Sequence, residues 1–315
     1  MKRILATALC VLAPFGASAS MFVDDTSNSL ANLMYIPAAG TLYGKTSVGM
    51  AQYEGKEKTA NSDIEGDFMT VSQELRWGFS NRLNGFVGLT HQISGEFETT
   101  TAGTTTTADV DGTFNPVFGV SYRTGEVSGN MLTSDVFLSY APDLFDAETD
   151  VDGASTALSP SVDGQLLGGD ALTLGGRVGR QFKAFQFSLD LAFTRLGENK
   201  NENTATNRTT TTDARFATKY GGSVLVPMGE ALWLQGSVHN ARRSSSETMT
   251  AGTRGTVRAE RSMIYGLGAL WALTPEKVLL GADLNYECIG NRRGGGTKDE
   301  DRKVLGLALS ARYQF

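Results

Sequence analysis

Residues 68–79 read Phe-Met-Thr-Val-Ser-Gln-Glu-Leu-Arg-Trp-Gly-Phe. Apolar side chains such as Leu75 and Trp77 alternate with polar ones such as Arg76. A period of two residues is typical of a β-strand, because successive side chains point to opposite faces. This stretch therefore predicts a strand with one apolar face and one polar face.

The same alternation recurs to the end of the chain and predicts twelve strands. They lie near residues 41–53, 67–80, 85–98, 114–124, 132–141, 171–183, 184–197, 214–228, 231–243, 260–273, 277–289 and 303–315. Most of these segments are longer than the usual globular strand. Their length suits tilted strands that cross a membrane, which need about 9–11 residues in the hydrocarbon.

The connections between these segments alternate between long and short. The long ones fall near 54–66, 99–113, 142–170, 198–213, 244–259 and 290–302. Short turns on one side and long loops on the other are typical of a transmembrane β-barrel of the outer membrane. We therefore predict an all-β fold, an antiparallel up-and-down barrel of about twelve strands. The Thr-rich tracts at 99–107 and 209–212 are expected to be flexible loop segments.

Composition excludes several other classes of protein. The net charge of −6 argues against a nucleic-acid partner, and two cysteines in 315 residues argue against a disulfide scaffold. The aromatic content of 9% is too high for a disordered chain. A hydrophobic fraction of 40% with a mean hydropathy of −0.17 resembles a soluble protein. It is also the average expected of strands with one apolar and one polar face joined by polar loops.

The N-terminal residues 1–19 are predicted to be a signal peptide. Lys2 and Arg3 precede an apolar stretch, and Ala17-Ser18-Ala19 forms a cleavage site before Ser20. No later stretch is long and apolar enough for a transmembrane helix. We expect residues 20–40 to be a periplasmic lead-in or a plug segment, and residues 41–315 to form the barrel.

The chain resembles the outer-membrane β-barrel class of Gram-negative bacteria. Its last strand ends in Arg312-Tyr313-Gln314-Phe315, and Tyr313 and Phe315 are similar to the C-terminal assembly signal of that class. The resemblance implies recognition by the barrel-assembly machinery, contact with outer-membrane lipid and lipopolysaccharide, and two periplasmic termini. Residues 24–42, with Ile36-Pro37-Ala38-Ala39-Gly40, also resemble the N-terminal plug of the long-chain fatty-acid transporter family.

Alternation also predicts which charged side chains face the barrel interior, or lumen. These candidates are Glu74, Arg76, Glu96, Arg177, Asp190, Arg215, Lys219, His239, Asp283, Glu287 and Arg312. Mixed charges can line a polar path for a small solute, or they can form structural ion pairs in a filled barrel.

The leading hypothesis is an outer-membrane channel for passive or plug-gated diffusion of a small, unidentified solute. The alternatives are a non-transport surface barrel, structural or receptor-like through its long loops, and an envelope-lipid-modifying enzyme using His239. We expect no enzymatic activity, no catalytic residue, no cofactor and no metal.

Overall fold

A computed structural model describes most of the chain. It covers residues 30–57, 62–109, 111–126, 132–144, 147–150, 161–164, 169–182, 184–203, 208–229, 231–257, 259–274, 277–292 and 298–315. The predicted signal peptide, residues 1–19, lies outside these described residues. Within them, no helix is long and apolar enough to cross a membrane.

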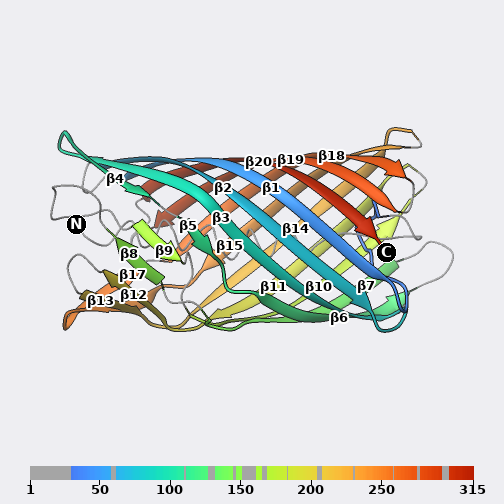
Figure 1. Cartoon of the computed structure of the whole chain (residues 1–315), viewed down its shortest axis with the longest axis horizontal. Helices are drawn as coiled ribbons and strands as arrows, with labels where there is room; N and C mark the ends of the chain where they lie inside the picture. Colours follow the sequence, from blue (N-terminus) through green and yellow to red (C-terminus); the bar gives the residue numbers. More distant parts are fainter. Residues whose placement is uncertain are drawn as a thin grey trace.

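Twelve long strands form the wall of a closed barrel (Figure 1). They are β1 (Leu42–Glu57), β2 (Ser62–Gly78), β3 (Leu83–Thr101), β6 (Val117–Glu126), β7 (Leu132–Ala141), β10 (Ala171–Gln181), β11 (Gln186–Leu196), β14 (Arg215–Pro227), β15 (Leu232–Arg243), β18 (Glu260–Thr274), β19 (Val278–Arg292) and β20 (Lys298–Gln314). Each pairs antiparallel with the next one in this order. The predicted fold is therefore confirmed.

The pairing of the first strand with the last one closes the barrel. β1 and β20 stay in register from Tyr43 opposite Gln314 to Glu57 opposite Glu300. Closure leaves no open sheet edge, so the wall strands bond their backbone N–H and C=O groups to one another. This is a requirement for strands that cross hydrocarbon, where no water is present to satisfy those groups.

The wall has an apolar outside and a polar inside. On β7, for example, Thr133 and Asp135 are buried in the lumen, whereas Val136 and Leu138 are 44% and 45% exposed on the outer face. A soluble protein buries its apolar face, so this inverted pattern fits a wall surrounded by lipid.

The two ends of the barrel differ (Figure 1). We call the end that holds the chain's C-terminus the short-turn end; there β2–β3, β10–β11 and β14–β15 are joined by short turns. At the opposite end, the long-loop end, the remaining strands extend the wall. They are β4 (Thr104–Asp109), β5 (Asp111–Thr113), β8 (Ala147–Asp150), β9 (Ser161–Gly164), β12 (Asn199–Asn203), β13 (Arg208–Thr212), β16 (Ser246–Thr250) and β17 (Thr253–Val257).

The Thr-rich tracts lie in this extension as strands, so the prediction of flexible loop segments was wrong. β3 pairs with β4, and β12 pairs with β13. β-Branched threonine favours extended backbone. The β3–β4 hairpin turns at Ala102 and Gly103, with φ of 52° and 82°. Two consecutive residues with positive φ match the tight turn that a two-residue hairpin requires.

Candidate functional site

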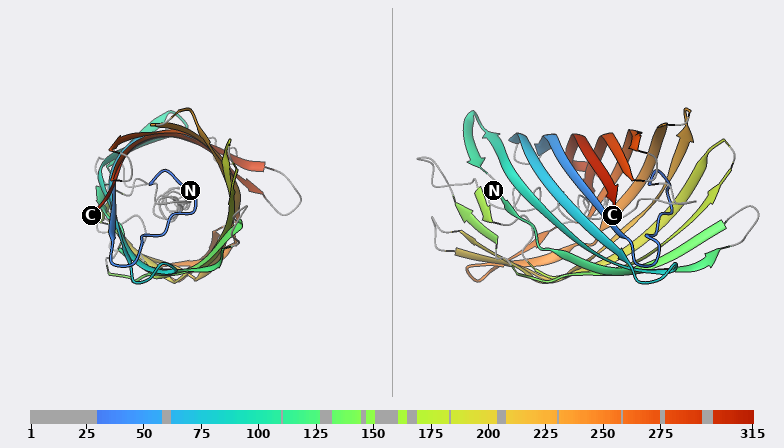
Figure 2. Two further views of the ribbon diagram at one scale, coloured as in Figure 1. Left: turned by 90° about the vertical axis from the view of Figure 1, so that its right-hand side faces the viewer. Right: turned by 45° about the vertical axis from the view of Figure 1, so that its right-hand side comes forward.

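Residues 30–37 lie inside the barrel at the short-turn end, and we call them the lumen segment. Figure 2 shows this part of the chain, in blue, within the ring of strands. Leu30 and Tyr35 are each 2% exposed, and Met34 is 1% exposed. The segment forms no helix or strand; within it the Met34 amide donates to Asn32 Oδ1 at 3.0 Å, and other backbone groups need partners on the wall.

Three arginines of the wall donate to backbone carbonyl oxygens of the lumen segment. Arg177 donates to Leu33 at 3.2 Å and to Tyr35 at 3.1 Å. Arg123 donates to Met34, and Arg312 donates to Leu30 at 3.3 Å. Because the acceptors are main-chain atoms, the arginines fix the path of the segment rather than the identity of its side chains.

A shared carboxylate fixes the position of two of these arginines. Asp135 lies 3.0 Å from Arg123 and 2.9 Å from Arg177, and its side chain is 1% exposed. Asp135 stands directly opposite both arginines in the strand register. A buried carboxylate between two guanidinium groups neutralises part of their charge and orients their remaining N–H donors.

An apolar patch of the lumen wall packs against the lumen segment. Leu225, Leu270 and Leu279 face inward and are at most 3% exposed, in contact with Leu30, Leu33 and Tyr35. The Tyr35 and Tyr43 rings lie 5.2 Å apart. These inward leucines depart from the polar lumen face and mark the place where the wall contacts protein rather than water.

The chain leaves the lumen segment over Gly78. The Gly40 amide donates to the Gly78 carbonyl at 2.8 Å, and the Gly78 amide donates to Thr41 at 3.1 Å. A Cβ atom at position 78 would lie 2.1 Å from the Ala38 carbonyl oxygen. Only glycine allows this close backbone approach.

Further along the lumen, charged side chains form two more groups. His239 Nε2 lies 2.9 Å from an Asp190 carboxylate oxygen. Glu260 contacts Arg302 at 2.7 Å and Arg243 at 3.7 Å. All these side chains are inward-facing and at most 9% exposed.

Among the described residues, several buried lumen atoms have no hydrogen-bond partner. They include Asp190 Oδ1, Arg215 Nη1 and Glu287 Oε1. Buried polar atoms require partners, and where protein supplies none, water or a polar solute must do so. This part of the lumen is therefore suited to water and polar solutes.

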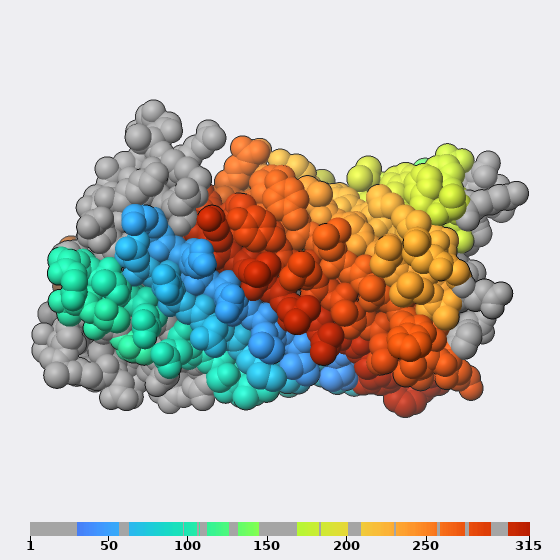
Figure 3. All heavy atoms as spheres, turned by 90° about the horizontal axis from the view of Figure 1, so that it is seen from above, coloured from blue at the N-terminus to red at the C-terminus, as the bar shows by residue number. Residues whose placement is uncertain are grey.

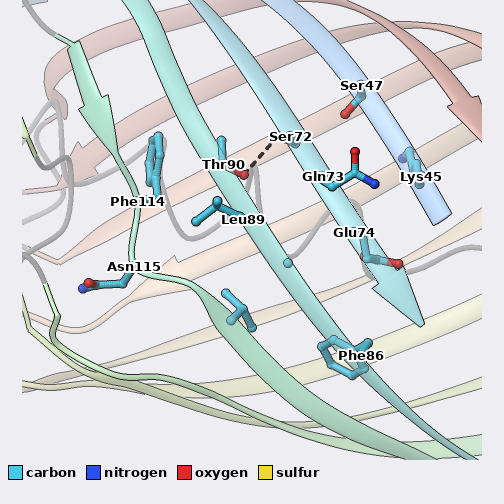
Figure 4. A pocket seen from close by; sticks show the side chains of 12 residues that line it. Lys45, Ser47, Ser72, Gln73, Glu74, Phe86, Leu89, Thr90, Phe114 and Asn115 are labelled. Atoms are coloured by element: carbon cyan, nitrogen blue, oxygen red, sulfur yellow. Dashed lines mark hydrogen bonds between the residues drawn. The ribbon is translucent and has the colours of Figure 1, made fainter. Parts of the chain in front are cut away.

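A pocket opens toward the lumen beside β1, β2 and β3 (Figure 4). Its lining combines the hydroxyl groups of Ser72 and Thr90, 3.0 Å apart, with the ring of Phe86 and the charges of Lys45 and Glu74. Glu74 is paired with Arg76 at 2.5 Å, outside the lining. Arg76 therefore compensates the negative charge of Glu74. The Lys45 ammonium then gives the pocket a positive charge.

The structure gives the position of every predicted lumen residue. Nine are buried on the lumen face: Glu74, Arg76, Arg177, Asp190, Arg215, Lys219, His239, Glu287 and Arg312. Asp283 is on the same face and is half-buried. These residues do not converge on one point. Arg177 and Arg312 contact the lumen segment, whereas Asp190 and His239 pair further along the wall.

The prediction for Glu96 was wrong, because Glu96 is exposed on the outer face. A β-bulge in β3 pairs Ser94 with Met69 but Gln92 with Thr70, which leaves Ile93 without an opposite residue. One extra residue inverts the alternation beyond it. Glu96 consequently stands opposite Asp67, which is exposed on the same outer face.

Alternation could have identified further lumen charges that the sequence analysis did not name. They are Lys45, Arg123, Asp135, Arg243, Glu260 and Arg302. Glu260 is the first residue of the predicted strand 260–273. Arg302 lies one residue before the predicted strand 303–315. Asp135 lies in a clearly alternating segment, between inward Thr133 and Phe137.

With these additions, basic side chains outnumber acidic ones on the described lumen face. The basic ones are Lys45, Arg76, Arg123, Arg177, Arg215, Lys219, Arg243, Arg302 and Arg312, and the acidic ones are Glu74, Asp135, Asp190, Glu260, Asp283 and Glu287. The described lumen face is thus more positive than the chain as a whole, which carries −6.

The two residues of the predicted assembly signal lie at the short-turn end. Phe315 is 75% exposed, and its ring lies 5.3 Å from that of Tyr313. The Phe315 amide donates to the Leu42 carbonyl at 2.9 Å, which joins the two ends of the wall. Their role in assembly stays a prediction.

No protein-family model and no curated protein matches this chain. Solved structures do. An outer-membrane channel from Pseudomonas putida F1 is 12% identical, with a TM-score of 0.60 over 93% of this chain and 100% of that one. The transport unit of the autotransporter AIDA-I from Escherichia coli is 12% identical, with a TM-score of 0.57 over 95% and 98%.

The translocator domain of the autotransporter NalP from Neisseria meningitidis is 11% identical, with a TM-score of 0.52 over 98% of each chain. The chain therefore has the fold of the outer-membrane β-barrel proteins. The resemblance of residues 24–42 to the fatty-acid transporters stays a prediction.

Proposed function

We propose that this protein is an outer-membrane channel for passive diffusion of a small anionic solute, gated by the lumen segment. The observation that supports this proposal most directly is the protein segment inside the lumen. A short irregular segment lies inside the barrel, held chiefly by arginine hydrogen bonds to its backbone and by apolar contacts. Such contacts are weaker than the continuous strand ladder of the wall, so the segment can leave while the barrel stays closed.

The similar channel from Pseudomonas putida F1 supports this proposal at the level of the fold. In the proposed orientation the short turns and both termini face the periplasm, and the long-loop end faces outward. The excess of basic side chains in the lumen favours anions, because a positive pore concentrates them. The proposal contains no catalytic step, cofactor or metal.

Planar-bilayer recordings of the purified protein test the proposal. The intact chain is expected to give brief openings, and a variant without residues 30–37 is expected to give larger and longer ones. Silence of both proteins, with the barrel shown to be folded, would defeat the channel proposal. Equal currents from both would retain the channel but remove the gate.

A second candidate is a surface barrel that acts through its long-loop end. It is favoured by the hairpins β12–β13 and β16–β17, which pair with each other through β13 and β16 and form an ordered extension of the wall. If this second function is correct, deletion of both hairpins abolishes the phenotype that the protein confers on the cell. Substitutions of lumen residues leave that phenotype intact.

A further inference from the structure

We infer that the outer wall carries a binding site for a phosphorylated lipid headgroup, centred on Arg242 of β15 and Arg261 of β18. We call these two residues the outer arginine pair. This inference goes beyond the proposed channel, since it concerns the outside of the barrel. It depends only on the proposed orientation, in which the long-loop end lies at the outer leaflet.

The two arginines stand directly opposite each other in the register of β15 and β18. Both are exposed on the outer face. Neither forms an ion pair with a described residue, although exposed ion pairs occur elsewhere at this end, such as Lys56 with Asp63 at 3.0 Å. Like charges directly opposite each other destabilise a sheet. An anion bound between them would remove that cost.

Neighbouring side chains hold the Arg242 guanidinium against the wall. Its Nε donates to Asn240 Oδ1 and its Nη2 donates to the Tyr220 hydroxyl, each at 3.2 Å. The guanidinium carbon lies 5.9 Å from the centre of the Tyr220 ring. Asn240 is itself 5% exposed and donates to the Ser262 carbonyl at 3.3 Å. Three of the five guanidinium N–H donors are left for a ligand in a fixed plane.

The position along the barrel identifies the ligand as a lipid headgroup. Tyr265 and Tyr286 stand opposite each other on the outer face, 45% and 37% exposed, and Leu267 beyond them is 68% exposed. Exposed tyrosines beside an apolar band mark the membrane interface. Arg261 is four residues past Tyr265 toward the long-loop end, roughly 14 Å along a tilted strand. Because the strands are tilted by about 35–45°, this is roughly 10–11 Å along the membrane normal, which places Arg261 on the headgroup side of the aromatic belt.

The charge around the rim localises the site. Lys303 of β20 is also exposed on the outer face, two strands away from Arg261 and opposite Glu54 of β1. On β1, β2 and β3 the three acidic residues Glu54, Glu65 and Glu98 stand opposite one another. β18, β19, β20 and β1 form one continuous outer surface (Figure 3). The acidic row on β1, β2 and β3 is thus separate from the outer arginine pair on β15 and β18, which fits a lipid at a defined position rather than a uniform belt. Guanidinium groups bind phosphate oxygens in pairs of hydrogen bonds.

Native mass spectrometry of the purified full-length barrel in detergent tests this site, with phosphorylated lipid A as the probe. The double variant Arg242→Gln/Arg261→Gln is expected to bind lipid A at least about tenfold more weakly than the unaltered protein. The matched control is Lys56→Gln/Arg254→Gln, which removes two exposed cations from the same end, and its binding is expected to stay unchanged. Arg261→Lys, which keeps the charge, should restore part of the binding lost in Arg261→Gln.

Two further arms identify the chemistry. Dephosphorylated lipid A should bind the unaltered protein as weakly as lipid A binds the double variant. Excess inorganic phosphate should leave the lipid complex in place, because the acyl chains contact the apolar wall below. Full displacement by inorganic phosphate, equal binding of the dephosphorylated lipid, or unchanged binding by the double variant would each overturn the inference.

A change in gel migration on heating verifies that each protein is folded. The single variant Arg261→Gln replaces the double variant if the double variant does not fold. Channel conductance is expected to be the same in all these proteins, so the two proposals fail separately.

Discussion

The guanidinium of Arg177 donates a hydrogen bond to the carbonyl oxygen of Tyr35 at 3.1 Å, which joins the middle of a wall strand to a segment 142 residues earlier in the chain. The same guanidinium contacts Leu33 and Asp135. Arg177 is thus the residue where the wall, its ion pairs and the lumen segment meet. The gating proposal depends most directly on it.

Replacement of Arg177 by alanine is expected to increase the open fraction of the channel. The change removes two hydrogen bonds to the lumen segment, and bonds to a charged group are each worth about 1.5–3 kcal/mol. A gain of about tenfold in open probability in bilayer recordings corresponds to about 1.4 kcal/mol. Arg195→Ala, which removes an exposed arginine from the adjacent strand, is the control and should change little. An unchanged open fraction in Arg177→Ala would show that these bonds do not hold the gate.

Replacement of Gly78 by alanine tests the gate without a change in charge. The new Cβ would collide with backbone atoms of Pro37 and Ala38, so the base of the lumen segment must shift. We expect more frequent openings in single-channel traces, together with an unaltered charge selectivity. Gly88→Ala is the matched control, because a Cβ at Gly88 would contact nothing within 4 Å. Identical traces for both variants would contradict the proposed close approach.

The lumen charges predict selectivity for anions. In a gradient of potassium chloride, the reversal potential is expected to indicate chloride over potassium, more strongly at low salt. Salt screens these charges, with a Debye length of about 30 Å at 0.01 M and about 3 Å at 1 M. Lys45→Glu, in the lumen, should shift the selectivity toward cations. Lys56→Glu, exposed on the outer face, should not. A cation-selective unaltered channel would refute the anionic solute but not the channel.

Adjacent residues on opposite faces test the membrane assignment of the wall. Leu284 is 45% exposed on the outer face, and Asn285 lies on the lumen face of the same strand. Leu284→Arg is expected to lower the free energy of unfolding in lipid by an amount between about 1 kcal/mol, the cost of a charge near the interface, and about 4 kcal/mol, the cost at the bilayer midplane. Asn285→Arg should cost much less, since its side chain enters the polar lumen. Denaturant titrations in vesicles, followed by gel migration, measure both. Equal costs would argue against a lipid-facing outer wall.

The sequence determined the fold of this protein almost completely. A period of two residues is a local property, so segments such as 277–289 reveal a strand and its two faces without knowledge of any partner. The alternation of short and long connections then implied the order in which these strands pair. Most charged lumen residues followed from the same alternation, including Arg177 and Glu287.

Tertiary structure alone decided the rest. The bulge at Ile93 adds one residue to β3 and turns Glu96 outward, and it becomes visible only in the pairing of β3 with β2. The contacts of Arg177 with the lumen segment join residues more than 140 positions apart. Alternation states which face a side chain occupies, but not which partner it meets across the barrel. That depends on strand register and on the path of residues 30–37, which have no periodic pattern of their own.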